Sequence, residues 1–212
     1  NQLSTCKGNE EEEIDQLRKF KHTITFLIGS AEMEGLVSYE QSRIGLTILA
    51  EIIVRAAFDL SQKLLASRYG EVKDFDGETC NFAIVGLGKL GGGEMTYHSD
   101  LDLIFIHSGE GTTTGNSMAG AQEYWIKIIQ RLISCLSTIT RTGFAYKLDT
   151  RLRPSGNAGV LVSTLDTYLN YHDSSEPWEH QALIKARVIG GRGNSEWFQQ
   201  VKDVLHRAVY EW

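Results

Sequence analysis

The sequence has few cysteines and no long apolar run. Its three cysteines, Cys6, Cys80 and Cys135, lie far apart along 212 residues. That spacing fits neither a zinc site nor a disulfide framework, so it predicts reduced thiols in a cytoplasmic protein. No apolar stretch approaches the roughly 18 residues of a membrane span, and the polar N-terminus lacks the pattern of a signal peptide. A membrane or secreted protein is therefore not expected.

A basic excess is also missing. The chain has 21 Lys and Arg residues against 27 Asp and Glu residues, which gives a formal net charge of −6. Proteins that bind DNA or RNA usually carry a basic surplus, so this balance argues against a nucleic-acid partner. The length and the ordinary composition predict one globular domain, or one domain with a helical extension.

The N-terminal third of the chain has helical patterning. A mixed apolar and basic pattern predicts a first helix over residues 16–29. Ser38, followed by Gln41 three positions later, has the spacing of a capping box at the start of a second helix, and Gly70 is a natural stop for it. The apolar residues at helical spacing in this second segment are Leu46, Leu49, Ile53, Ala56, Leu60 and Leu64.

Four apolar runs predict strands in the remainder of the chain. The first covers residues 82–85, and a glycine-rich loop at 86–99 separates it from the second, at 101–106. Two shorter runs, at 144–148 and 160–162, predict a third and a fourth strand. A loop and a long helix precede the third strand, and the apolar face of this helix comprises Trp125, Ile128, Leu132, Leu136 and Ile139. Two or three helices close the chain, and the last has Trp197, Val201, Val204 and Ala208 in register.

The glycine-rich loop matches a known nucleotide-binding pattern only superficially. Residues 86–91 read G-x-G-x-x-G after a strand, which is typical of dinucleotide-binding folds. Only the nine residues from Gly92 to Asp100 separate the motif from the next strand, whereas a parallel crossover needs about a dozen or more. A dinucleotide site is therefore not expected. A Walker A loop is excluded because Lys89 is followed by Leu90 rather than Ser or Thr.

Two carboxylates stand at the start of the second strand. Strand alternation places Asp100 and Asp102 on one face and Leu101 on the other. Burying two neighbouring carboxylates is costly unless a cation compensates them, and oxygen ligands without His or Cys favour Mg²⁺ over zinc. The alternative is a solvated strand end with two ordinary surface acids.

A third carboxylate, Asp149, ends the third predicted strand and is followed by Arg151 and Arg153. Arginine can bind phosphate oxygens through two parallel hydrogen bonds, so both arginines are candidate phosphate ligands. The alternative for each arginine is a structural ion pair with an aspartate.

These motifs together carry a resemblance to known enzymes. Gly88, followed after eleven residues by Asp100-Leu101-Asp102 and by a later carboxylate on another strand, resembles the nucleotidyltransferase superfamily. More narrowly, three segments resemble the glutamine synthetase adenylyltransferases, also called glutamate–ammonia-ligase adenylyltransferases. These segments are residues 86–105, 147–163 and 178–187, and the helical region before them is similar as well.

The resemblance implies an α+β fold, a polymerase-β-like mixed sheet flanked by helices with an N-terminal helical extension. The implied boundaries are 1–78 for the helical extension, 79–192 for the nucleotidyltransferase core and 193–212 for a C-terminal helix that leads into a further helical region.

The resemblance implies the general plan of this family, in which two such domains stand in tandem and are joined by helical regions. One attaches AMP to a tyrosine of glutamine synthetase, and the other removes it by phosphorolysis. The segments Arg153–Gly156 and Trp178–Leu183 resemble the attaching, C-terminal half. The implied function is Mg²⁺-dependent transfer of AMP from ATP to glutamine synthetase, which regulates nitrogen assimilation, with the PII signal protein acting through the full-length enzyme. The alternatives are the adenylyl-removing domain and a catalytically silent module that binds a nucleotide or a partner, although three intact carboxylates argue against a silent module.

The resemblance also implies roles for individual residues. Asp100, Asp102 and Asp149 would hold two Mg²⁺ ions, with Asp149 as the candidate base for the tyrosine hydroxyl. Glycines leave room for phosphates to approach backbone amides. Lys89 would contact a phosphate, or it is a surface lysine. Ser99 would donate its hydroxyl to the β- or γ-phosphate, or it caps the turn before Asp100. The candidate nucleotide-binding residues are Gly88, Lys89, Gly91, Gly92, Ser99, Lys147, Arg151 and Arg153.

Four conspicuous residues receive structural interpretations. His98 is interpreted as a loop residue rather than a metal ligand, and Trp178 as a core residue rather than a base-stacking platform. Lys185 and Arg187 are interpreted as surface charges on a helix, with a position facing the active site as the alternative.

Overall fold

The computed structural model describes residues 10–172 and 176–210. Cys6 lies outside these ranges, while Cys80 and Cys135 are buried and free, as predicted. None of the helices in these ranges combines the length and the apolar character that crossing a membrane requires.

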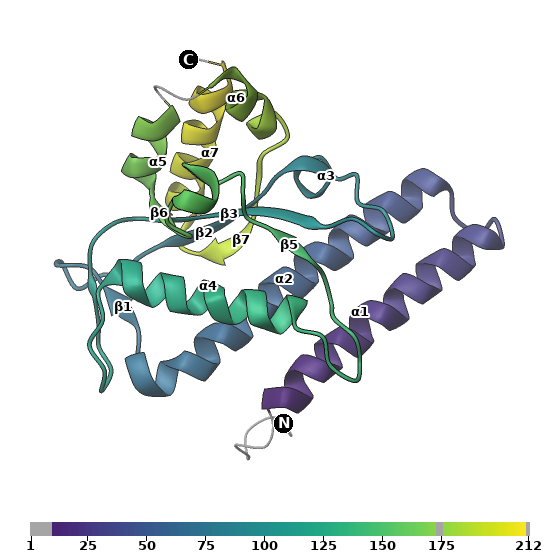
Figure 1. The fold of residues 1–212 in the computed structure, drawn as a ribbon, viewed down its shortest axis with the longest axis horizontal. Coiled ribbons are helices and arrows are strands. Elements are labelled where there is room, and N and C mark those ends of the chain that lie inside the picture. Colours follow the sequence, from purple (N-terminus) through teal and green to yellow (C-terminus); the bar gives the residue numbers. More distant parts are fainter. Residues whose placement is uncertain (1–9, 173–175, 211–212) are drawn as a thin grey trace.

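Two long helices, α1 (Glu10–Met33) and α2 (Tyr39–Tyr69), form an antiparallel hairpin at the N-terminus (Figure 1). The predicted capping box is confirmed: the Gln41 amide donates to the Ser38 hydroxyl at 3.2 Å, and the Ser38 amide donates to the Gln41 side chain at 2.8 Å. Gly70 ends α2 with a φ of 67°, a conformation that favours glycine. Helix α1 is longer than the predicted 16–29, and its first turn is made of four glutamates, which favourably oppose the positive end of the helix dipole.

The central sheet is mixed and has the strand order β5–β3–β2–β7, with β6 beside β3. Its strands are β2 (Phe82–Gly86), β3 (Leu101–His107), β5 (Leu148–Asp149), β6 (Ser163–Thr164) and β7 (Arg187–Arg192). Strand β2 pairs antiparallel with β3 and β7, while β5 and β6 pair parallel with β3. Because β2 and β3 are antiparallel, the glycine motif between them is not part of a dinucleotide-binding crossover, as predicted.

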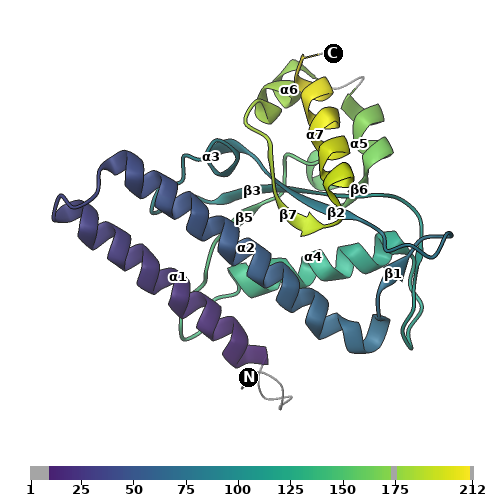
Figure 2. The ribbon, with the colours of Figure 1, turned by 180° about the vertical axis from the view of Figure 1, so that it is seen from behind.

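Helices cover both faces of this sheet (Figures 1 and 2). Phe82, Ile84, Leu103 and Phe105 face α2 and α4 (Ala121–Ser137), where Trp125 stacks on Phe82 with ring centroids 4.3 Å apart. The alternate residues of the same strands pack against α5 (Leu165–His172), α6 (Pro177–Leu183) and α7 (Ser195–Tyr210); they are Ala83, Val85, Ile104 and Ile106. The predicted α+β fold, a helix-flanked mixed sheet with N-terminal helices, is confirmed.

The remaining elements are short. Strands β1 (Val72–Lys73) and β4 (Thr112–Thr113) form a separate antiparallel pair. Helix α3 (Gly88–Gly91) is a single turn after β2, and η1 (Gly156–Ala158) is a 3₁₀ turn after β5.

The strand predictions need three corrections. The third strand is limited to Leu148–Asp149 rather than 144–148, because its partner β3 begins only at Leu101 and leaves the preceding residues unpaired. The fourth lies at Ser163–Thr164 instead of 160–162, where it pairs with the end of β3. Strand β7 was not predicted, because its sequence RVIGGR contains two glycines and no clear alternation.

Two apolar side chains that were expected in the core are exposed to solvent. Trp178 is 58% exposed on α6, so its interpretation as a core residue is wrong. Ile139 is also exposed, because α4 ends at Ser137 and the helical register does not reach it.

Candidate active site

The glycine turn between β2 and β3 packs directly against Asp102. The Leu87 amide donates to the Asp102 carbonyl at 2.9 Å. Gly88 has a φ of +51°, and a Cβ there would lie 2.5 Å from the Asp102 carboxylate oxygen Oδ2. At Gly91 a Cβ would lie 2.0 Å from the Lys185 carbonyl oxygen. The motif glycines therefore permit close packing around the carboxylate, which explains the pattern without a dinucleotide.

Arg187 fastens this turn to the sheet. Its guanidinium donates to the carbonyls of Leu90 and Gly91, both at 3.1 Å, and pairs with Glu51 of α2 at 2.6 Å. The interpretation of Arg187 as a helix-surface charge is wrong, because the residue lies in β7. Its basic side chain thus adds hydrogen bonds to carbonyls at the end of a short helix.

The parallel register of β3 and β5 brings two predicted carboxylates together. Asp102 and Asp149 are direct register partners, and exposed Asp100 immediately precedes β3. The pKa of Asp102 is raised above its usual value, first by burial and then by the negative charges of Asp149 and Asp100. Arg151 and Lys89 oppose this shift, so they too lie within electrostatic reach of Asp102. The three carboxylates therefore form one electrostatic group.

Asp149 is held by Arg151. The Arg151 backbone amide donates to Oδ1 of Asp149 at 2.9 Å. The Arg151 side-chain Nε lies 3.0 Å from Oδ1 and 2.9 Å from Oδ2 of the same carboxylate. These hydrogen bonds lower the pKa of Asp149 despite partial burial. The ion pair that the sequence offered as the alternative for Arg151 is thus present, although the Arg151 side chain is exposed.

Arg153 has a different environment. Its guanidinium donates to the carbonyl and hydroxyl of Thr150 at 2.7 and 2.9 Å and to the Gly159 carbonyl at 3.3 Å. These contacts stabilise the loop after β5. The arginine therefore makes structural hydrogen bonds to loop oxygens, and among the described residues it forms no ion pair with an aspartate.

The other predicted residues lie on two sides of the carboxylates. Gly88 and Lys89 line a cavity of about 420 Å³ together with Leu152, Gln181 and Lys185. The interpretation of Lys185 as a charge on a helix is wrong, because the residue follows the end of α6. Its side chain forms an ion pair with Glu94 at 2.7 Å. Gly91 is buried in the turn, and Gly92 is exposed beside the Lys185 side chain.

Ser99 and Lys147 line a second cavity that also contains Asp100. The Ser99 hydroxyl accepts from the Thr96 amide at 2.9 Å, which is the turn-capping contact proposed as its alternative role. Lys147 is exposed, and its carbonyl accepts from the Leu101 amide at 2.9 Å, which starts the pairing of β5 with β3.

The carboxylates are not arranged as a finished metal site. Across residues 10–172 and 176–210, no three His, Cys, Asp or Glu side chains form a group that could hold a metal ion as they are placed. Arg151 occupies both oxygens of Asp149. The chemistry of the group nevertheless suits a hard cation, because Asp102 is partly buried beside two other carboxylates and is destabilised as an anion.

Comparison with known proteins identifies the family of the chain. The sequence model of the family described as glutamate-ammonia ligase adenylyltransferase matches residues 1–202. The chain belongs to this family. The bifunctional glutamine synthetase adenylyltransferase/adenylyl-removing enzyme of Vibrio parahaemolyticus is 39% identical over 187 residues, which are 85% of the chain and 20% of that protein. The enzyme of the same name from Hahella chejuensis is 37% identical over 202 residues, which are 92% of the chain and 21% of that protein.

The chain thus corresponds to a domain of a much larger adenylyltransferase. It spans about a fifth of the length of the relatives that it matches. The names of these relatives contain both an adenylyl-transferring and an adenylyl-removing activity, so membership in the family leaves open which of the two this domain carries.

Proposed function

We propose that this domain transfers AMP from ATP to a tyrosine hydroxyl of glutamine synthetase and releases pyrophosphate. The observation that carries the proposal is the register of Asp102 and Asp149 beside the glycine turn, within a chain of the adenylyltransferase family. In this reaction the tyrosine oxygen forms a bond to the α-phosphorus, the bond from that phosphorus to the bridging oxygen of pyrophosphate breaks, and the hydroxyl proton leaves.

Asp100, Asp102 and Asp149 would hold Mg²⁺, two ions in the arrangement that the resemblance implies. When bound, Mg²⁺ would neutralise phosphate charge and favour ionisation of the attacking hydroxyl. The raised pKa of Asp102 fits this role, because a nearby cation would relieve the repulsion among the carboxylates.

Asp149 is the candidate acceptor of the hydroxyl proton. A tyrosine hydroxyl has a pKa of roughly 10, so it needs help to ionise at neutral pH. While Arg151 binds Asp149, the pKa of Asp149 is lowered and this carboxylate is a poor base. Withdrawal of the exposed Arg151 side chain would restore basicity to Asp149 and free the guanidinium for a phosphate oxygen.

The cavity beside the glycine turn is the proposed site of ATP. Lys89 supplies positive charge there, Lys185 is ion-paired with Glu94 of the same lining, and Leu152 and Ile184 supply an apolar wall. Such a combination of a few charged groups with an apolar lining is typical of nucleotide sites. Its volume of about 420 Å³ lies within the usual range for small-molecule pockets, roughly 300–1,000 Å³.

We favour the transferring over the removing activity because Arg153–Gly156 and Trp178–Leu183 resemble the transferring half. His180 in the second segment is buried in the α5–α7 layer, and its Nδ1 lies 2.5 Å from the Ala208 carbonyl oxygen. His180 is therefore interpreted as a structural residue of this helical layer. Regulation by PII would reach this domain through the full-length enzyme.

Two incubations test the proposal. With ATP, Mg²⁺ and unmodified glutamine synthetase, the chain should produce adenylylated synthetase and pyrophosphate in equal amounts. With adenylylated synthetase and inorganic phosphate, it should release no ADP. ADP release in the second incubation without transfer in the first would identify the removing activity instead. Nucleotide binding without either reaction would identify a silent module.

A further inference from the structure

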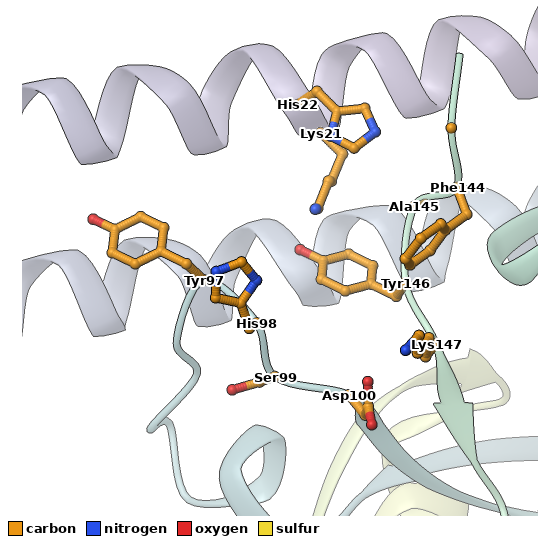
Figure 3. Close-up of a pocket in the computed structure, with 11 residues that line it drawn as sticks. Lys21, His22, Tyr97, His98, Ser99, Asp100, Phe144, Ala145, Tyr146 and Lys147 are labelled. Atoms are coloured by element: carbon orange, nitrogen blue, oxygen red, sulfur yellow. The ribbon is translucent and has the colours of Figure 1, made fainter. Parts of the chain in front are cut away.

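A second cavity, of about 280 Å³, lies beside Asp100. Three segments far apart in the sequence line it: α1 contributes Lys21 and His22, the loop before β3 contributes residues 97–100, and the segment before β5 contributes residues 143–147 (Figure 3). None of the residues from Gly88 to Glu94 lines this cavity, and Asp100 lies at its edge.

The interior of the cavity is both aromatic and cationic. Tyr97, Phe144 and Tyr146 present rings, and Lys21 Nζ lies 4.9 Å from the centre of the Tyr146 ring. Burial lowers the pKa of Lys21. Neither Lys21 nor Lys147 forms an ion pair within the part of the chain that the structure describes. The cavity therefore offers a flat apolar surface next to Lys21 and Lys147, with the carboxylate of Asp100 at its edge, which suits an aromatic ring on an acidic segment.

The two cavities differ in how they lie relative to the carboxylates. Asp100 lines the smaller cavity, whereas the larger one is lined by Gly88, where an added Cβ would lie 2.5 Å from an Asp102 carboxylate oxygen. In an in-line displacement, the attacking and leaving oxygens stand on opposite sides of the phosphorus. If pyrophosphate leaves on the side of the glycine turn, the acceptor hydroxyl must approach from the side of Asp100.

We propose that the smaller cavity receives the acceptor tyrosine, with its ring beside Tyr146 and Phe144, its hydroxyl directed toward Asp100 and acidic neighbours near Lys21. This inference rests on the proposed function and adds to it the place where the protein substrate docks. The volume of about 280 Å³ is slightly below the usual range for pockets that enclose whole small molecules, so it fits one ring rather than a nucleoside triphosphate.

The test compares Lys21→Glu and Lys21→Met with Lys19→Glu. Lys19 is an exposed residue of the same helix and lies outside both cavities. The measurements are the kcat of AMP transfer and its KM for glutamine synthetase, the affinity for a fluorescent ATP analogue, and the thermal midpoint of unfolding, which verifies folding. Lys21→Glu should raise the KM for glutamine synthetase about tenfold and leave ATP affinity within about twofold, because only the acceptor contacts Lys21. Lys21→Met should have a smaller effect in the same direction, and Lys19→Glu should have none.

Equal weakening of ATP binding would assign the cavity to the nucleotide and overturn the proposal, as would an unchanged KM in both Lys21 variants. A failure of the proposed function looks different, because the unaltered chain then transfers no AMP. In that case, binding of the same three variants to immobilised glutamine synthetase still tests the cavity. Binding that Lys21→Glu leaves equal to that of Lys19→Glu would overturn the docking site.

Discussion

Asp102 and Asp149 lie opposite one another across the parallel pair of β3 and β5. Parallel pairing requires strands that are distant in sequence, so neither aspartate reveals its partner from local pattern alone. The pairing places Asp149 near Asp102 and Asp100, and burial, followed by the negative charges of these two neighbours, raises the pKa of Asp102. This concentration of negative charge beside a glycine turn is the feature on which the proposed chemistry depends.

Replacing Asp102 by asparagine should separate catalysis from folding. Asp102→Asn removes a partly buried charge that is repelled by two neighbours, so the thermal midpoint should stay equal or rise. AMP transfer should fall by about 100-fold or more, since even outer-shell partners of metal ligands cost roughly 10–100-fold when removed. Asp76→Asn changes an exposed carboxylate in the β1 loop and is the control. Transfer at the wild-type rate by Asp102→Asn would contradict the metal-ligand role.

Gly88→Ala tests the close approach of the turn to Asp102. Both Gly88 (φ +51°) and Gly77 (φ +82°) have a positive φ, so alanine at either position should destabilise the fold by about 1–2 kcal/mol. Only at Gly88 would the new Cβ collide with the Asp102 carboxylate, whereas Gly77 has no atom within 4 Å of that position. Gly88→Ala should therefore lose most of the transfer activity, and Gly77→Ala should retain it. Equal activity of the two variants at matched stability would rule out the contact as a functional constraint.

Arg151 and Arg153 should behave differently although they are two residues apart. Arg151→Gln removes an exposed side chain, so the free energy of unfolding should change by no more than about 0.5 kcal/mol. The KM of the Arg151→Gln variant for ATP should rise about tenfold, because the variant loses one charge-assisted hydrogen bond to a phosphate oxygen.

Arg153→Gln removes hydrogen bonds to the loop carbonyls of Thr150 and Gly159 and should destabilise the fold by about 1–3 kcal/mol. Chemical denaturation and ATP-dependent kinetics on both variants check these expectations. A stability loss confined to Arg151→Gln would reverse the assignment of structural and nucleotide-binding roles.

Local chemistry made several features predictable from the sequence. The capping box of Ser38 and Gln41 depends on residues three positions apart, and the short gap after Gly91 was enough to exclude a parallel crossover. Alternation likewise predicted Leu101 on the face opposite Asp102, and Leu101 indeed packs in the core between the sheet and α2 and α4.

Features built from distant segments were not predictable in this way. Strand β7 has two glycines and charged ends, and it becomes a strand because β2 offers it an antiparallel partner. Lys185 and Arg187 approach the glycine turn only through this pairing. Lys21 reaches the second cavity because the α1–α2 hairpin turns α1 toward the segment before β5. Tertiary pairing determined each of these positions, and no local pattern encodes it.

The hydrogen bonds of Asp15, which attach α1 to the segment after α4, should make the stability of the fold depend on pH. Asp15 accepts hydrogen bonds from Thr142 at 2.7 Å and from the buried Arg18 at 3.2 Å, and Arg18 also donates to carbonyls at the end of α4. These bonds, first that from Thr142, lower the pKa of Asp15 below its ordinary value of 3.8. A carboxyl with a lowered folded-state pKa stabilises the fold above its unfolded-state pKa, and this stabilisation is lost as the pH falls through the folded-state value.

The wild type should therefore be more stable than Asp15→Asn at neutral pH, and the difference between them should shrink once the pH drops below 3.8. Thermal midpoints of both proteins, measured from neutral to acidic pH, check this. Glu11→Gln, at an exposed acid of the same helix, is the control and should follow the wild-type curve. A difference between the wild type and Asp15→Asn that stays constant across this range would show that the hydrogen bonds of Asp15 do not depend on its charge.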